Sequence, residues 1–558
     1  MTKINFNKKI IFGLGLFFIL GSFSSSCVSD EDVTITQPEL YSDDDVKSYA
    51  DLFKIFWTAM DQRYNYFYEQ KRKDGMNWND IYSKYYPKFQ ALKSFQRGDN
   101  FTDKEISEDS KKAIQYFTEI IDPIIDRHFS VDILLNGSKT TYIKKNFRGG
   151  MSEKPHNIYR FDKKYAYMKD RLQTTAKLQV PELLLAGNLK SNPDIYYFSF
   201  SEYVLSKYFQ IKLADKYLSP DPGNIYLLTE AEIEKNPRLN AIKDINFRNK
   251  VKSFTLNIWR KWNSLAKAEE VKRFNEQVDI FNNTEEVTDQ LLYTAEEALK
   301  KYYSMPLYDQ KFNYQPVYNS ESRDYIQWFM HRMDEYVKFA YEKINFGRAV
   351  FEVNEKGPFY KNFLNPLHQG KIKKLILDLR GNGGGNVMDA RFFVDRLITK
   401  SAVWGYQRTK QGNGRFNYTP WIPMHTKTHK FGLPSNIPIV VLTDKGSFSM
   451  AEITTLMLKS QGSQVISMGD YSGGATAGLG SSDLFNGGLT SKVTSYLDFY
   501  MPMMATKDVS GKVVEGIGVK PNVYIGPPSD AEVEQMKASP KTFVDKVMLK
   551  AIEHLSSK

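Results

Sequence analysis

The chain has 558 residues, 41% of them hydrophobic and 25% charged, which is the composition of a folded protein with about two to four domains or one enlarged domain. This composition excludes an intrinsically disordered chain. The formal net charge is +11, but the lysines are scattered and interrupted by acidic residues, as in residues 267–273, so we expect no nucleic-acid partner.

The first predicted element is a signal sequence. Lys8 and Lys9 precede an apolar run over residues 10–20, and a short serine-rich stretch then leads to Cys27, the only cysteine in the chain. The apolar run has the length of a secretory signal and is too short to span a bilayer permanently. A single cysteine also excludes an internal disulfide.

The position of Cys27 resembles that of the lipidated cysteine in bacterial lipoproteins. We therefore expect residues 1–26 to be removed, Cys27 to carry a lipid that attaches the protein to the membrane, and residues 27–45 to form an acidic tether. The implied location is the cell envelope, as an outer-membrane lipoprotein, and the acidic residues 30–32 resemble tracts that direct some lipoproteins to the cell surface. The alternative is an ordinary cleaved signal that leaves a free thiol.

Residues 46–135 are predicted to form a small helical domain. Leu52 and Phe56 lie on one helical face, and a further helical run covers residues 111–125. This run is followed by His128, and taken alone a histidine at the end of a helix is more commonly a cap or a surface residue than a catalytic base.

Residues 136–193 are a small linking region in which no peptide-binding PDZ module is recognisable. The core is predicted to cover residues 194–530. A helical insertion from about 205 to 343 interrupts it, since long charged stretches there carry apolar residues such as Trp259 at helical intervals. The insertion is either a lid over a cleft or a structural buttress. Residues 531–558 are predicted to form a terminal amphipathic helix.

A glycine-rich turn follows the predicted buried strand at residues 375–379. The strand ends in a polar segment that includes Gly383, Gly384 and Gly385. Glycines allow the backbone to adopt positive φ and to lie close to a ligand, so that N–H groups face developing negative charge. This turn is therefore a candidate oxyanion hole.

A second segment has the same order of elements, with a strand at residues 437–443 and a helix at residues 450–459. Ser449 stands at the junction, next to the unpaired N–H groups of the first helical turn, such as that of Met450. These are the requirements of a nucleophilic serine beside its oxyanion donors. The alternative is that Ser447 and Ser449 only cap the helix.

His425 and His429 have a spacing of four that could hold a metal if they lay on a helix. Trp421 and Pro423 indicate a loop instead, and no cysteine or carboxylate ligand is adjacent. We therefore expect no metal, and nothing in the sequence indicates a cofactor.

Three segments resemble the signature blocks of the C-terminal processing (tail-specific) serine peptidases, at residues 378–385, 447–452 and 469–474. In that family the nucleophile stands three residues before a glutamate, here Glu452, which implies that Ser449 is the nucleophile. One branch pairs the serine with a lysine. The matching position is Ala475, so the resemblance does not extend to this branch.

The other branch, which includes the tricorn core protease and the retinoid-binding modules of the retina, uses a histidine with a supporting glutamate. Residues 126–130 resemble its N-terminal signature and residues 515–522 its late signature. The resemblance implies that His128 is the base and that Glu515 orients it. The sequence departs from this branch at Arg127, where tricorn-type sequences carry a serine.

The resemblance implies an α/β fold with a ClpP/crotonase-like spiral core, an N-terminal helical domain and a helical insertion. It further implies a serine peptidase that hydrolyses proteins or peptides internally or at their carboxyl ends, with oxyanion donors at Gly384, Gly383 and Met450. The alternatives are a non-catalytic ligand- or peptide-binding surface lipoprotein and a crotonase-like acyl-thioester enzyme. Retention of all three catalytic residue types favours hydrolysis over both.

Overall fold

The computed structural model describes residues 40–558 except for residues 98–99, 151–157, 174–183, 206–227, 267, 285–286, 304–312, 344–356, 435–436, 477–490 and 503. The predicted signal sequence and Cys27 lie outside the described residues. The chain divides into two compact units. The N-terminal unit comprises Met1–Met151, Arg408–Trp421 and Gly478–Ala505, and the core unit comprises Ser152–Gln407, Ile422–Ala477 and Thr506–Lys558.

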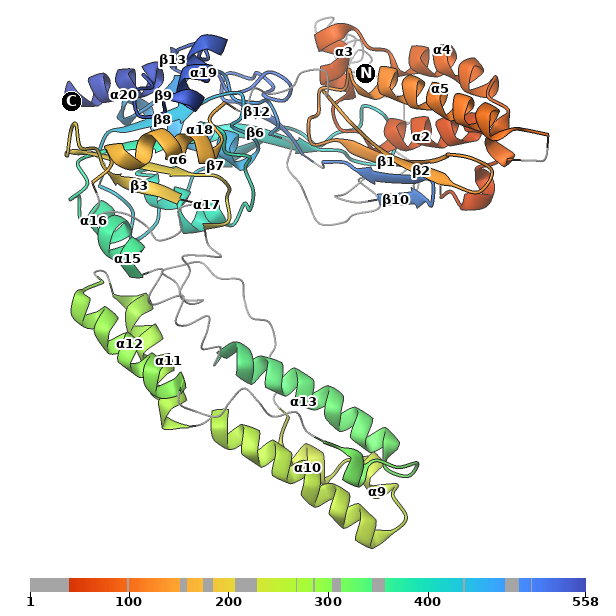
Figure 1. Ribbon diagram of the computed structural model, residues 1–558, viewed down its shortest axis with the longest axis vertical. Coiled ribbons are helices and arrows are strands. Elements are labelled where there is room, and N and C mark those ends of the chain that lie inside the picture. Colours follow the sequence, from red (N-terminus) through yellow and green to blue (C-terminus); the bar gives the residue numbers. More distant parts are fainter. Residues whose placement is uncertain are drawn as a thin grey trace, which may run out of the picture. The chain divides into compact units, whose positions relative to one another are not determined.

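The N-terminal unit packs helices against one antiparallel sheet (Figure 1). The helices are α2 (Tyr49–Arg63), α3 (Phe67–Asp74), α4 (Trp78–Gln90) and α5 (Asp103–Ile121). The sheet has the order β10-β11-β1-β2, with β1 (Ser130–Asn136), β2 (Tyr142–Arg148), β10 (Ser491–Thr494) and β11 (Leu497–Tyr500). Phe56 joins the two layers, since its ring centroid lies 5.3 Å from that of Phe117 and 5.9 Å from that of Phe499.

Two segments within the predicted core range belong to the N-terminal unit instead. One of these segments contains β11, and strand pairing is the reason for its place. β11 is antiparallel to β1, with Ser130 opposite Tyr500 and Ile133 opposite Leu497. Hydrophobic periodicity reports which face of a strand is buried but not which distant strand it pairs with. The sequence therefore could not place β11 in the N-terminal unit.

The core unit is built on a six-stranded sheet with the order β13-β9-β8-β5-β4-β3. Its strands are β3 (Leu184–Asn188), β4 (Ile195–Phe200), β5 (Lys374–Asp378), β8 (Ile439–Thr443), β9 (Val465–Gly469) and β13 (Val523–Tyr524). All neighbours are parallel except β3 and β4. A separate sheet of order β12-β6-β7 consists of β6 (Val403–Thr409), β7 (Ile422–His425) and β12 (Met504–Asp508). The predicted α/β core is confirmed.

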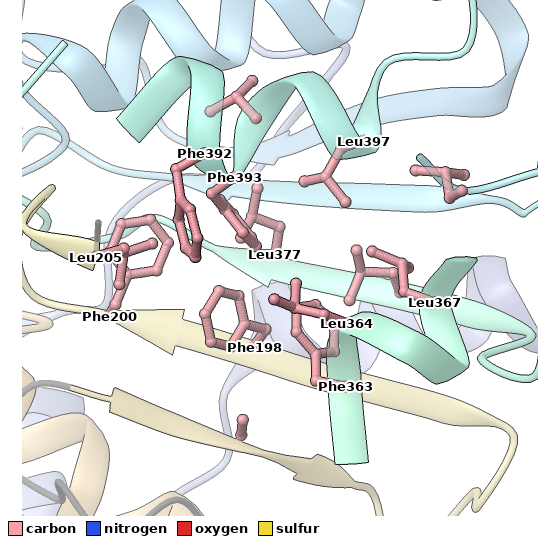
Figure 2. Packing of buried hydrophobic residues seen from close by; sticks show 14 of the residues in the cluster. Phe198, Phe200, Leu205, Phe363, Leu364, Leu367, Leu377, Phe392, Phe393 and Leu397 are labelled. Carbon is pink, nitrogen blue, oxygen red and sulfur yellow. The ribbon is translucent and has the colours of Figure 1, made fainter. Parts of the chain in front are cut away.

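Both faces of the six-stranded sheet are covered, as the continuous apolar runs in its strands require. One face carries Phe198, Phe200 and Leu377, which pack on Phe363 and Phe393 (Figure 2). The helices on this side are α15 (Gly357–Phe359), α16 (Asn365–His368), α17 (Asp389–Phe392) and α18 (Met450–Lys459). The opposite face packs on α6 (Phe161–Met168), α19 (Asp530–Ala538) and α20 (Lys546–Ser556).

The helical insertion has two parts. The first has a hydrophobic cluster of its own and consists of α8 (Glu230–Glu234), α9 (Pro237–Asn240), α10 (Ile245–Ala266) and α13 (Arg323–Lys343). The second consists of α11 (Glu269–Asn283) and α12 (Asp289–Tyr303), whose Phe274, Phe281 and Leu299 belong to the apolar cluster of the sheet. Phe281 packs on Tyr360 with ring centroids 6.0 Å apart. Among the described helices, none is long and apolar enough to cross a membrane.

Candidate active site

The site is built around Ser449, the last residue of the turn between β8 and α18, which we name the serine turn (residues 444–449). Its backbone has φ 53° and ψ −116°, so this non-glycine residue is in the left-handed region. Such a conformation costs about 1–2 kcal/mol and is held only when the surrounding structure imposes it, as at functional sites. The side chain is half-buried, and Ser449 forms a capping box with Glu452, in which the Ser449 N–H donates to the Glu452 carboxylate at 3.1 Å.

The turn after β5, which we name the glycine turn (residues 380–385), lies directly against Ser449. Gly384 has φ +85°, and a Cβ atom on it would lie 2.5 Å from Ser449 Cβ and 2.9 Å from the Met450 nitrogen. Neither distance is possible for a real side chain, so only glycine allows this approach. A Cβ atom on Gly383 would instead meet nothing within 4 Å.

The three predicted oxyanion donors differ in their hydrogen bonds. The Gly384 N–H donates to Asn382 Oδ1 at 2.9 Å, and the Gly383 N–H donates to the Ser201 carbonyl at 3.3 Å. The Met450 N–H, at the first position of α18, has no hydrogen-bond partner in the part of the chain that the structure describes. Met450 is therefore the donor already available to a ligand, whereas each of the two glycine N–H groups has a partner.

Glu452 connects the serine turn to a third turn (residues 470–476). Its carboxylate is fully buried and accepts from the N–H groups of Ser449 (3.1 Å), Gly474 (2.7 Å) and Ala475 (2.7 Å), as well as from Ser472 Oγ (2.6 Å). Burial raises the pKa of Glu452, while these donors oppose the shift. A carboxylate with this many donors fixes the position of the Ser449 backbone.

Glu515 lies beside the same third turn. Its Oε2 accepts from the Thr476 N–H at 2.7 Å and from Thr476 Oγ1 at 3.3 Å, and the residue is 1% exposed. The residue before Thr476 is Ala475, and its carbonyl accepts from the Ser449 N–H at 3.0 Å. Ser449 and Glu515 are thus held by adjacent residues of one turn, although they are far apart in sequence.

His128 belongs to the N-terminal unit, between α5 and β1. Asp126 fixes its backbone, since Asp126 Oδ1 accepts from the N–H groups of His128 (2.8 Å) and Phe129 (3.1 Å). Burial lowers the pKa of His128 to about 4, so the imidazole is neutral at pH 7, as a general base requires. Its Nδ1 atom is buried and has no hydrogen-bond partner among the described residues. Arg127 is partly exposed between these two residues.

Three residues that join the turns were not identified from the sequence. Asn382 binds the Gly384 N–H, Thr476 binds Glu515, and Asp444 binds N–H groups of both the serine turn and the glycine turn. Asn382 and Asp444 each bond an N–H two residues further on, which is the Asx turn that these residue types favour. That local preference was the available signal, but the bonds between turns depend on the fold.

A strained serine at a strand-to-helix turn, packed on a glycine turn and held by buried carboxylates, is the arrangement of a serine hydrolase. Residues 346–525, which include this site in the core unit, match the profile described as peptidase family S41. The chain therefore carries an S41 peptidase domain, and its resemblance to the C-terminal processing peptidases is confirmed.

Individual relatives match parts of the chain. The carboxy-terminal processing protease CtpB of Bacillus subtilis (strain 168) is 32% identical over 99 residues, which is 18% of this chain and 18% of that protein. A solved structure from Parabacteroides merdae, described as a candidate peptidase, is 14% identical, covers 91% of this chain and 97% of its own, and has a TM-score of 0.44. The tricorn protease structure is 20% identical over 40% of this chain and 20% of its own, with a TM-score of 0.23.

Proposed function

We propose that the protein is a serine peptidase that hydrolyses peptide bonds in proteins or peptides through Ser449. The observation that carries this proposal is the backbone of Ser449, held at φ 53° against Gly384 and followed by the Met450 N–H, which has no partner among the described residues. A serine that only capped a helix would have an extended backbone. Strain of this kind is retained where it positions a reacting atom.

In the proposed reaction the neutral imidazole of His128 takes the proton from Ser449 Oγ while Oγ attacks the scissile carbonyl carbon. The same proton then passes to the leaving amine nitrogen as the C–N bond breaks and an acyl-enzyme forms. Water repeats the attack, with His128 again as the base, and releases the acid product. Glu515 would bond the other imidazole nitrogen and stabilise the imidazolium. The proposal requires the His128 imidazole to reach hydrogen-bonding distance of Ser449 Oγ.

The oxyanion of the tetrahedral intermediate would be bound by the Met450 N–H, with the Gly384 N–H as the second donor and the Gly383 N–H as a further candidate. For this the Gly384 N–H must leave or share its present acceptor, Asn382 Oδ1. One oxyanion donor is worth about 2.7–4 kcal/mol in the transition state.

The name of CtpB supports a carboxy-terminal processing peptidase, and internal cleavage is the other form of the same proposal. The experiment is a peptide-library digestion with the wild type, Ser449→Ala and His128→Ala, together with labelling by a fluorophosphonate. The wild type should cleave and be labelled, and both variants should lose about 10³-fold or more in kcat. A folded wild type that is neither labelled nor active would instead indicate a non-catalytic ligand- or peptide-binding protein.

We also propose that Cys27 is lipidated, that it holds the protein in the outer membrane, and that the protein is exposed at the cell surface. The support is the sequence pattern alone, an apolar run over residues 10–20 followed by this single cysteine. Metabolic labelling with a fatty-acid analogue should label the wild type and not Cys27→Ser. Equal labelling of both proteins would refute the assignment, and digestion of intact cells with an added protease tests surface exposure.

A further inference from the structure

Asp444 is a buried carboxyl group to which the proposed steps assign no role. It directly follows β8 and is 7% exposed. Its Oδ1 accepts from the Gly381 N–H at 2.8 Å and from the Gly446 N–H at 3.0 Å. Gly381 belongs to the glycine turn and Gly446 to the serine turn, so one carboxyl oxygen binds both turns.

A second link lies beside the first. Ser447 Oγ accepts from the Asp444 N–H at 3.1 Å and donates to the Leu379 carbonyl at 2.8 Å, at the end of the strand that leads into the glycine turn. The Phe448 N–H adds a backbone bond to the Asn382 carbonyl at 2.9 Å. These hydrogen bonds surround the contact between Gly384 and Ser449. Side chains make the bonds of Asp444 and Ser447, whereas the bond between Phe448 and Asn382 joins backbone groups.

We propose that Asp444 is a positioning residue that holds the glycine turn at its working distance from Ser449 and Met450. This inference rests on the proposed function, because it assigns a purpose to the spacing between the nucleophile and its oxyanion donors. Displacement of reacting groups by about 1 Å can lower a rate by about 100-fold. Two turns that contribute parts of one site therefore need a rigid connection between them.

The connection depends on the charge of Asp444. Burial raises the pKa of Asp444 to about 6, and Oδ2 is a buried atom without a hydrogen-bond partner among the described residues. A proton on the carboxyl group weakens Oδ1 as an acceptor, because charge-assisted hydrogen bonds are about twice as strong as neutral ones. The bonds to the two turns are therefore strongest when Asp444 is ionised, above about pH 6.

Several charged and titratable groups face Asp444 from the neighbouring elements. Arg380, in the glycine turn, and Lys164, on α6, favour its ionised form, whereas Asp378 on β5 opposes it. The carboxyl group also borders a cavity of about 70 Å³, whose other titratable lining residues are Tyr159, Arg380, Lys445 and Asp470. Asp470 thus lines the same cavity without binding the glycine turn, since its Oδ1 accepts from the Tyr471 N–H at 2.7 Å.

The test measures kcat and KM against pH, on a peptide that the wild type cleaves, for Asp444→Asn, Asp444→Ala and the matched control Asp470→Asn. Asp444→Ala removes the acceptor and should lower kcat by about 100-fold with little change in KM. Asp444→Asn keeps Oδ1 and should restore kcat at pH 8 to within about tenfold of the wild type. In the wild type, kcat should fall as the pH drops through about 6, which we call the acidic limb of the pH profile. Asp444→Asn should move this limb toward about pH 4, where His128 becomes protonated.

Asp470→Asn should leave the limb at its wild-type position. Asp126, whose pKa burial raises to about 7, is unchanged in all of these variants, so a difference between them reports on Asp444. If Asp444→Ala does not fold, Ser447→Ala tests the same connection, and it should lower kcat by about tenfold without moving the limb.

An acidic limb that stays near pH 6 in Asp444→Asn would overturn the inference, as would a wild-type kcat in both Asp444→Ala and Ser447→Ala. Either result leaves the proposed function intact, because Ser449→Ala would still be inactive. A folded wild type without hydrolysis or fluorophosphonate labelling would refute the proposed function first, and with it the need for a positioning residue.

Discussion

Replacement of Gly384 by alanine tests the contact between the glycine turn and Ser449. The added Cβ atom would lie 2.5 Å from Ser449 Cβ, whereas ordinary contacts begin at 3.4 Å, so the two turns must separate by about 0.9 Å (3.4 minus 2.5). The φ of +85° adds a conformational cost of about 1–2 kcal/mol for any residue with a side chain. Both effects act at the place where Ser449 and Met450 must keep their positions.

We expect Gly384→Ala to lower kcat/KM by about 100- to 1,000-fold, equivalent to about 2.7–4 kcal/mol of transition-state stabilisation. The matched control is Gly383→Ala, because a Cβ atom there meets nothing within 4 Å and the N–H group is retained. It should stay within about threefold of the wild type. The assay is cleavage of a fluorogenic peptide, with the melting temperature of each variant measured alongside.

If Gly384→Ala and Gly383→Ala had equal activity, the close approach seen here would have no part in catalysis. If Gly384→Ala lost activity only in proportion to the fraction unfolded, the effect would be one of stability alone. The predicted result is a folded Gly384→Ala protein with low kcat, since the separation of the turns is local.

Three further predictions concern buried charges. Glu452→Gln places an amide NH₂ against N–H donors and should lower the free energy of unfolding by about 3 kcal/mol, measured by urea titration; an unchanged midpoint would refute its role in joining the turns. Lys164→Met removes the cation that donates to Ser199 Oγ at 2.7 Å and lies 3.8 Å from Asp378, and should cost about 3–5 kcal/mol; a neutral effect would show that Arg380 suffices for Asp378. Burial of the charge outweighs the hydrogen bonds that Asp444 accepts, so its pKa rises from 3.8 to about 6 on folding, and its contribution to stability is greatest below pH 3.8 and is lost as the pH rises through about 6. The stability of the wild type relative to Asp444→Asn should therefore fall by up to about 3 kcal/mol between pH 4 and pH 8, and a pH-independent difference would contradict the raised pKa.

The sequence predicted the local elements of the site well. Apolar runs of strand length located β5 and β8, and the predicted helix at residues 450–459 matches α18 (Met450–Lys459). These features depend on residues close in sequence, where periodicity and glycine preferences are informative. The junction position of Ser449 followed directly from them.

The features that the sequence did not provide are those made by distant residues. The pairing of β11 with β1, and the bond from Asp444 to Gly381, depend on which strands become neighbours. The occupation of the Gly384 N–H by Asn382 is local, but a side-chain conformation decides it and not a pattern of residue types. The low pKa of His128 is a result of burial, which a residue at the end of a helix does not reveal by itself.

The most direct test of the central claim is to locate the fluorophosphonate label by tandem mass spectrometry of the digested protein. Nucleophilic catalysis through the strained serine predicts one labelled peptide, with the added mass on Ser449 and none on Ser447 in the same turn. A label on Ser447, or a folded and cleaving enzyme without a label on Ser449, would contradict it.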